Sequence, residues 1–367
     1  MSTNSTHEFP APVGGVPDAL DFAPSIFFAA LYAILVPFAL WRIVHPRSRN
    51  VVLIATTFFC IERAASFSLR ATMARDATVR ASVGIDVYLQ TVYSGAFIAV
   101  GQDLANLLRA LLVSSTLGGD MVALHKLTPS HVRKAQKVQT LAQKRMDREV
   151  ALAQFYVTKG QEGEAYDVDD GASSTSGTAV SAPEFQDQTG LRKKIRVWFG
   201  VAGLMFILAT IVSAMSGGNF SSAVAGGSGD LVRLLWYVST ALALVLLVAI
   251  ALTAVFALKK LPRVPRTSGL WIIVVACLLS LVGIYRLTVI SNLTTSLLLT
   301  GPGTHNAPAD KAAFYVLQVA PEFLSIAILV SMNVRHVFGT GTWGDLRFND
   351  PKPKSKPATW EVGGGAA

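Results

Sequence analysis

Charged residues and cysteines are both scarce in this sequence. Asp, Glu, Lys and Arg together make up 15% of its 367 residues, whereas a typical soluble domain contains about 25%. Hydrophobic residues make up 51%. This balance argues against a soluble globular domain and favours a chain whose solvent is lipid. Long apolar stretches favour helices in lipid, so we predict an all-α membrane protein.

Chemically reactive side chains are also few. Cys60 and Cys277 lie within apolar stretches, which predicts small apolar fillers rather than a disulfide. None of the six histidines lies within such a stretch, and only His125 and His131 approach metal-ligand spacing. No nucleophile motif and no glycine-rich phosphate loop is present. We therefore expect no metal site, no cofactor and no enzymatic activity.

The net charge of +9 does not indicate a nucleic-acid partner. The basic residues gather at the ends of apolar stretches, where they act as signals of membrane topology. We therefore expect membrane lipids, and no nucleic acid, as partners.

Seven stretches are long and apolar enough to cross a bilayer, which takes about 20 residues. They are Pro24–Val44, Val51–Leu69, Asp86–Leu112, Val197–Met215, Leu231–Leu258, Leu270–Leu293 and Ala312–Val334. The sequence therefore predicts a polytopic protein with seven transmembrane helices.

Lys and Arg gather on one side of this arrangement. They occur in the first connection, in the connections between spans three and four and between spans five and six, and in the C-terminal tail. The N-terminal tail and residues 216–230 have none, and residues 294–311 have only Lys311. The connection after span two is the exception, with Arg70, Arg75 and Arg80. Since cytoplasmic connections carry the positive excess, we expect the N-terminus outside and the C-terminus in the cytoplasm.

Three Asn-x-Ser/Thr glycosylation acceptors agree with this orientation. They are Asn4, Asn219 and Asn292, and all three fall on or near the expected outer face. We therefore expect a glycoprotein of the plasma membrane or of another membrane of the secretory pathway.

Hydrophilic segments interrupt and follow the spans. The long connection contains a basic amphipathic pattern from Thr128 to Arg148. This pattern is typical of a helix on the anionic inner leaflet or of a solvated extension of span three. Low hydrophobicity after Gly160 and in the C-terminal tail favours disorder. The predicted organisation is an outer tail at 1–23, spans at 24–114, a cytoplasmic insert at 115–196, spans at 197–337 and a tail at 338–367.

Charged residues inside the spans are the candidate functional residues, because charge at the bilayer centre costs roughly 2.5 kcal/mol or more. They are Glu62 and Arg63 in span two, Asp103 in span three, Arg286 in span six and Glu322 in span seven. A pair between Glu322 and Arg286 is feasible, because spans six and seven are neighbours with a short connection. We expect Glu62 and Arg63 to pair better with other spans than with each other. The group forms either an ion-pair network that fixes packing or a polar cavity that binds a headgroup or relays a proton.

Span seven also contains a proline next to its charge. Pro321 precedes Glu322, and a proline within a helix frees the carbonyl four residues earlier, here that of Leu317. We therefore predict a kink beside the buried acid, an arrangement that often marks a cavity.

Short motifs occur at corresponding points of several spans. They are Ser66–Arg70 after Glu62, Leu89-Gln90 and a closing Arg109, Ile284-Tyr285-Arg286, and Tyr315 with Asn333 and His336. In these motifs and in its layout the chain resembles the fungal lipid-translocating exporter family, seven-helix proteins linked to aminocholesterol and sphingoid-base resistance. Val289 and Gln318 differ from the acids usual in that family. The resemblance implies transport of an amphipathic lipid.

Two functions fit this layout. The first is translocation or efflux of an amphipathic lipid in membrane stress resistance, with the five intramembrane charged residues along the path. The alternative is a seven-helix receptor that signals through the cytoplasmic insert, although an outer cysteine pair, an acid before Arg109 and an Asn-Pro-x-x-Tyr segment are missing. A retinal protein is excluded, because span seven has no lysine beyond Lys311 at its edge.

Overall fold

The computed structural model describes residues 7–46, 48–117, 188–261, 263–301, 303–340, 342 and 344–345. The chain divides into a helical unit, residues 1–113 and 190–367, and a second unit, residues 114–189. The predicted basic helix and acidic segment of the insert, the tail after residue 345 and Asn4 lie outside the described residues.

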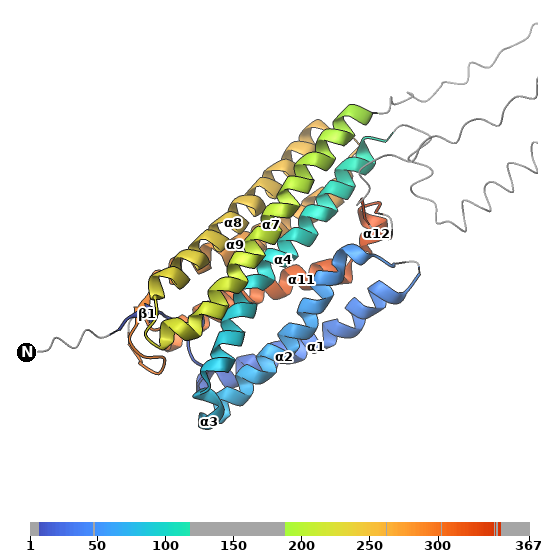
Figure 1. The fold of residues 1–367 in the computed structure, drawn as a ribbon. Helices are drawn as coiled ribbons and strands as arrows, with labels where there is room; N and C mark the ends of the chain where they lie inside the picture. The colour runs from blue at the N-terminus through green and yellow to red at the C-terminus, as the bar shows by residue number, and fades with distance from the viewer. Residues whose placement is uncertain are drawn as a thin grey trace, which may run out of the picture. The chain divides into compact units, whose positions relative to one another are not determined.

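Within these ranges, seven helical segments are long and apolar enough to cross a membrane (Figure 1), which confirms the predicted seven helices. They are η1–α1 (Ala19–Asp21 and Phe22–Val44), η2–α2 (Val51–Leu53 and Ile54–Arg75), α4 (Val83–Ser115), α7 (Thr189–Val224), α8 (Gly229–Lys260), α9 (Arg266–Val289) and α10–η3–α11 (Pro308–Ala313, Phe314–Val319 and Ala320–Ser331). Shorter elements are α3 (Ala77–Arg80), α12 (Val334–Val337) and the strands β1 (Phe9–Pro10) and β2 (Leu293–Thr294).

Several helices extend beyond the apolar stretches that predict them. The 36 residues of α7 span about 54 Å, whereas the hydrocarbon layer is about 30 Å thick. This helix therefore includes residues 189–196, which the sequence assigned to the insert, and Asn219, which it assigned to a connection. Apolar windows locate the membrane-buried part of a helix, but polar turns at its ends stay helical because capping groups satisfy them.

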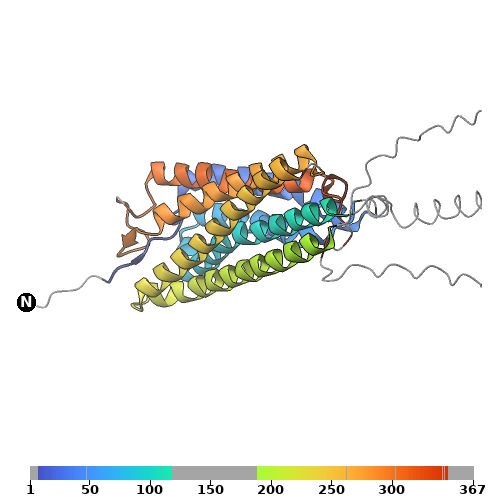
Figure 2. The ribbon, with the colours of Figure 1, turned by 90° about the horizontal axis from the view of Figure 1, so that it is seen from above.

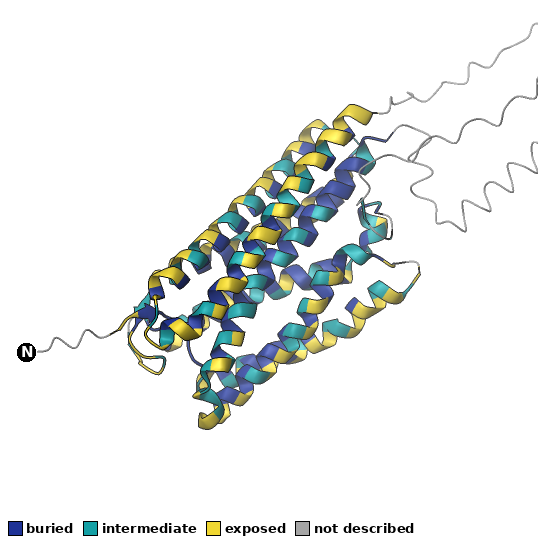
Figure 3. Ribbon diagram, viewed as in Figure 1, coloured by how far each residue is buried: buried dark blue, intermediate teal, exposed yellow. Residues whose placement is uncertain are grey.

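The described helices differ widely in how much of each is buried, and most leave large apolar side chains exposed. In the most apolar part of α4, 83% of the residues are buried, against 17% in α7. Figure 3 shows α4 as the most continuously buried helix, and in Figure 2 it again runs between other helices. Large side chains on the outer helices face outward, among them Phe58, Trp198 and Leu252. An apolar exterior of this extent is the surface that lipid covers.

Close helix packing around α4 depends on small residues. A side chain at Gly101 of α4 would collide with Phe206 of α7, and one at Gly217 of α7 would collide with Thr91 of α4. Elsewhere α1 packs along α2, and α8 packs along α9. In lipid, packing of this kind replaces the hydrophobic effect as the force that holds helices together.

The segment before α1 lies across one end of the helices, which we call the N-terminal side. Its strand β1 pairs antiparallel with β2, with Phe9 opposite Thr294. The amide of Val13 donates to the side chain of Gln90 on α4 over 2.9 Å. This segment therefore joins the start of the chain to α4 and to the connection after α9. The opposite end, where α4 stops and α7 starts, is the insert side.

Candidate functional site

Polar residues of α2 recur every seven positions on one face. Thr56, Arg63 and Arg70 are all buried, and successive members lie about 10 Å apart along the helix axis. Each of the three contacts a buried carboxylate of another element. The face therefore defines three levels of buried polar contact, on the insert side, at the centre and on the N-terminal side.

Arg63 is the hub of the middle level. Its Nε lies 2.5 Å from Oε1 of Glu322 on α11, and its Nη1 lies 3.2 Å from Oε2 of Glu62. Its guanidinium also packs over the ring of Tyr93, 5.1 Å from the ring centroid. The expectation that Arg63 pairs with another span is confirmed, but it pairs with its neighbour Glu62 as well. We call Glu62, Arg63, Tyr93, Arg286 and Glu322 the central cluster.

The pairing of Glu322 with Arg286 that the sequence made feasible does not occur among the described contacts. Glu322 pairs with Arg63, while Nη1 of Arg286 donates to the backbone carbonyl of Tyr93 over 3.0 Å. The residues just before Glu322, Phe314–Val319, form a π-helix, and the amide of Ala320 donates to Tyr315, five residues earlier. A π-helical turn holds one extra residue and shifts the face that follows by about 100°. The predicted irregularity at Pro321 thus takes the form of a wider turn before the proline.

The central cluster contains more hydrogen-bonding groups than partners. Arg286 is fully buried, and its Nε and Nη2 have no hydrogen-bond partner among the described residues. The hydroxyl group of Tyr93, also in the cluster, has no such partner either, and the same is true of two buried groups outside the cluster, Oε1 of Gln318 and the hydroxyl of Tyr32. Buried polar groups without partners are rare in folded proteins and call for an explanation. Unused donors and acceptors of this kind suit a polar ligand.

Asp103 belongs to the insert-side level rather than to the central cluster. Its Oδ2 accepts hydrogen bonds from the amide and the hydroxyl of Thr56, over 3.0 and 2.7 Å. It lines a cavity of about 310 Å³ together with Gln102, Asn106 and Arg109. No ion pair of Asp103 occurs in the described part of the chain. The five predicted residues thus separate into one cluster of four and one carboxylate at a cavity of its own.

A saturated charged network lies on the N-terminal side, formed by Asp21, Arg70, Lys311 and Tyr315. Asp21 accepts from Arg70 over 2.8 Å, from Tyr315 over 2.9 Å and from Lys311. Carbonyls of the N-terminal segment accept the remaining donors, those of Gly14 and Gly15 from Arg70 and that of Val16 from Lys311. We call this set the N-terminal network. It holds the N-terminal segment against α2 and α10–η3.

The N-terminal network is absent from the sequence prediction. Asp21 fell in the outer tail, and Lys311 lay at the edge of span seven. Arg70 appeared as an exception to the charge bias and as the end of the motif Ser66–Arg70, and Tyr315 belonged to another motif, but no contact between these residues was predicted. The available signal was spacing, because Arg70 follows Arg63 by two helical turns and so lies on the same face of α2.

Two glycosylation acceptors can be placed. Asn219 is half-buried on α7, and its side-chain amide donates to the carbonyl of Met215 over 2.8 Å. Asn292 is half-buried beside His305, 3.3 Å away. Both lie toward the N-terminal side, so glycosylation there stays a prediction.

Comparison with protein-family models, curated proteins and solved structures finds no match to this chain. The seven apolar helices by themselves make it an integral, multi-pass membrane protein.

Proposed function

We propose that this protein moves an amphipathic lipid across or out of the membrane, and that the central cluster contacts the polar headgroup. The observation that carries the proposal is Arg286, a fully buried arginine on α9 with two guanidinium nitrogens unused. A charge held inside a membrane protein in this way is costly. A ligand that accepts its hydrogen bonds would offset that cost.

The charge balance of the cluster supports an amphipathic substrate. Two arginines and two glutamates give it no net formal charge, and Arg63 already shares its guanidinium between Glu62 and Glu322. An incoming ammonium group could take over one carboxylate, while a hydroxyl or phosphate could take the donors of Arg286. A sphingoid base, whose headgroup has an amine and hydroxyls, matches this pattern and agrees with the resemblance to lipid-translocating exporters.

The proposed orientation places the N-terminal side outside the cell. Two of the three arginines that oppose this orientation have structural partners, since Arg70 belongs to the N-terminal network and Arg80 donates to carbonyls at the end of α2. Their position therefore reflects folding as well as topology. The basic ends of α7 and α8 would then lie on the cytoplasmic side.

A receptor is the second candidate, and one contact favours it. Asp345, near the start of the tail, accepts from Arg196 of α7 over 2.9 Å and lies 3.4 Å from Nε of Arg109 on α4. The tail thus ties together the two helices that flank the insert. Rearrangement of this contact would carry a signal to the insert without any transport.

Efflux of a labelled sphingoid base separates the two candidates. Cells would express the wild type, Arg286→Gln or Glu322→Gln at matched surface abundance, with Arg233→Gln as a control, since Arg233 pairs with Asp230 at the surface of α8. We expect the wild type and Arg233→Gln to speed efflux and the two central variants to abolish the gain. If none of the four forms speeds efflux above that of cells without the protein, translocation is rejected and the receptor is favoured.

A further inference from the structure

Three arginines follow one another at five-residue intervals on the N-terminal side, and two of them have saturated or structural roles. Arg70 is fully buried in the N-terminal network. Arg80 donates to the carbonyls of Met73 and Ala74 over 3.1 and 2.8 Å, which satisfies the end of α2. The third, Arg75, is exposed and has neither kind of contact.

The guanidinium of Arg75 is positioned by an aromatic ring, but its hydrogen-bond donors have no partner among the described residues. The guanidinium carbon lies 3.9 Å from the centroid of the Phe22 ring, a cation–π contact between α2 and α1. No hydrogen bond or ion pair of Arg75 occurs within the described ranges. Its five N–H donors are therefore oriented by an aromatic face and available to a planar or tetrahedral oxyanion.

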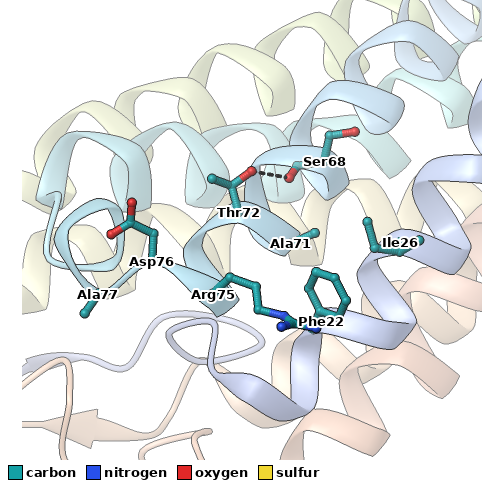
Figure 4. A pocket seen from close by; sticks show the side chains of 8 residues that line it. All are labelled: Phe22, Ile26, Ser68, Ala71, Thr72, Arg75, Asp76 and Ala77. Atoms are coloured by element: carbon teal, nitrogen blue, oxygen red, sulfur yellow. Dashed lines mark hydrogen bonds between the residues drawn. The ribbon is translucent and has the colours of Figure 1, made fainter.

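This arginine lines a groove between α1 and α2 with a volume of about 690 Å³ (Figure 4). Phe22, Ile26 and Ala71 form its apolar wall, and Ser68 and Thr72 line it with hydroxyl groups. Thr72 donates to the carbonyl of Ser68 over 3.1 Å, so that hydroxyl already has a partner. The groove therefore offers one charged end and a wall that tolerates hydrocarbon.

The depth of these residues matches the layers of a bilayer. Arg75 is the last residue of α2, which places it at the level of the headgroups. Ser68 lies seven residues earlier, about 10 Å deeper along the helix. Ile26 lies one turn into α1 from Phe22. A molecule that filled the groove would thus meet a cation at headgroup level and apolar side chains below it.

We propose that this groove binds a membrane phospholipid from the leaflet on the N-terminal side, with its phosphate on Arg75 and an acyl chain along Ile26 and Ala71. Arginine binds phosphate through paired hydrogen bonds, which makes it more selective than a simple point charge. The cation–π contact with Phe22 fixes the guanidinium and reduces the entropy lost on binding.

Asp76 adds a preference among phospholipids. It lines the same groove, and its Oδ1 accepts from the amide and the hydroxyl of Thr78 over 2.8 and 2.6 Å. These hydrogen bonds lower the pKa of Asp76, so the carboxylate stays ionised. Figure 4 shows Asp76 pointing away from Arg75 and Phe22. A zwitterionic headgroup can place its phosphate at Arg75 and its ammonium group toward Asp76.

The test is direct lipid binding by the purified full-length chain in detergent, followed by native mass spectrometry. Phosphatidylcholine is the probe. Diacylglycerol, which lacks the phosphate, and phosphatidylglycerol, which lacks the ammonium group, serve as comparison lipids. We expect Arg75→Gln to weaken phosphatidylcholine binding about tenfold, whereas the matched control Arg80→Gln leaves it unchanged. Diacylglycerol should bind equally to all forms. Asp76→Asn, which keeps the hydrogen bonds to Thr78, should remove the preference for phosphatidylcholine over phosphatidylglycerol.

Three results would overturn the proposal. One is phosphatidylcholine binding that is unchanged in Arg75→Gln, and another is an equal loss in Arg80→Gln. The third is displacement of the lipid by excess soluble glycerophosphocholine, which would assign the site to the free headgroup.

Elution profile and thermal stability identify a misfolded variant, and cross-linking of a photoactivatable phosphatidylcholine to residues 68–76 of the wild type gives a test without mutation. Because binding is read directly, the proposal stands or fails separately from lipid translocation.

Discussion

The N-terminal network and the central cluster bury the same kinds of residue but treat them differently. Arg70 and Arg286 are both fully buried. Arg70 donates to a carboxylate, a hydroxyl and two backbone carbonyls. Among the described residues Arg286 has one hydrogen-bond partner, the carbonyl of Tyr93, and two unused nitrogens. A saturated network fixes a structure, and an unsaturated one keeps capacity for a ligand.

The largest loss of stability is expected from Asp21→Ala. This change leaves Arg70 and Lys311 buried without their shared carboxylate, and removal of one partner of a buried ion pair costs about 3–5 kcal/mol. Thermal unfolding in detergent would measure it. Asp230→Ala serves as the control, because Asp230 is exposed and its surface pair contributes at most about 1 kcal/mol. Equal unfolding temperatures for the two variants would contradict a structural role for the network.

Arg63→Leu is expected to cost about 3 kcal/mol, because Glu322 would be left buried without a cation. The double variant Arg63→Leu with Glu322→Leu should recover most of that loss, since it removes both charges. Unfolding of the wild type, both single variants and the double variant gives the coupling free energy. Additive losses would show that the 2.5 Å contact between the two side chains does not stabilise the fold.

Arg286→Gln should separate function from stability. It removes a buried charge that has no ion pair among the described residues, so we expect no decrease in unfolding temperature. Sphingoid-base efflux should fall about tenfold or more, the effect of losing one hydrogen bond to a charged group. Arg70→Gln, in contrast, should clearly lower the unfolding temperature. A matching drop in stability for both arginine variants would remove the distinction between the two regions.

The smallest expected effect is a pH dependence from His305, in the connection between α9 and α10. Burial lowers the pKa of His305 below its usual value of 6.5. The unfolded chain therefore binds a proton that the folded chain does not, and stability falls as the pH drops below about 6.5 toward the folded-state pKa. His305 has a positive φ of 62°, which asparagine tolerates. His305→Asn should lose this slope in unfolding experiments between pH 7 and pH 5.

Local sequence patterns predict the helices well, because each span is a continuous apolar run whose length is set by the bilayer. The partners of the buried charges could not be predicted in the same way. Arg63 and Glu322 are separated by 259 positions, and nothing near either residue indicates that α2 lies beside α11. The pairing of Glu322 with Arg286 was based on the similar depth of the two residues and on the short connection between spans six and seven, whereas Glu322 pairs with Arg63 of α2. Asp21 was missed because it lies before the first apolar run.

The order in which the chain is synthesised has a consequence for the N-terminal network. Asp21 and Lys311 are 290 positions apart, and translation at about 5–20 residues per second separates their synthesis by roughly 15–60 seconds. During that interval the first six spans are made, while the lysine that completes the network does not yet exist. The N-terminal segment can therefore settle into its final place only after the last span is inserted. A chain that stopped before Lys311 would leave Asp21 paired with Arg70 alone, so the N-terminal network would be incomplete.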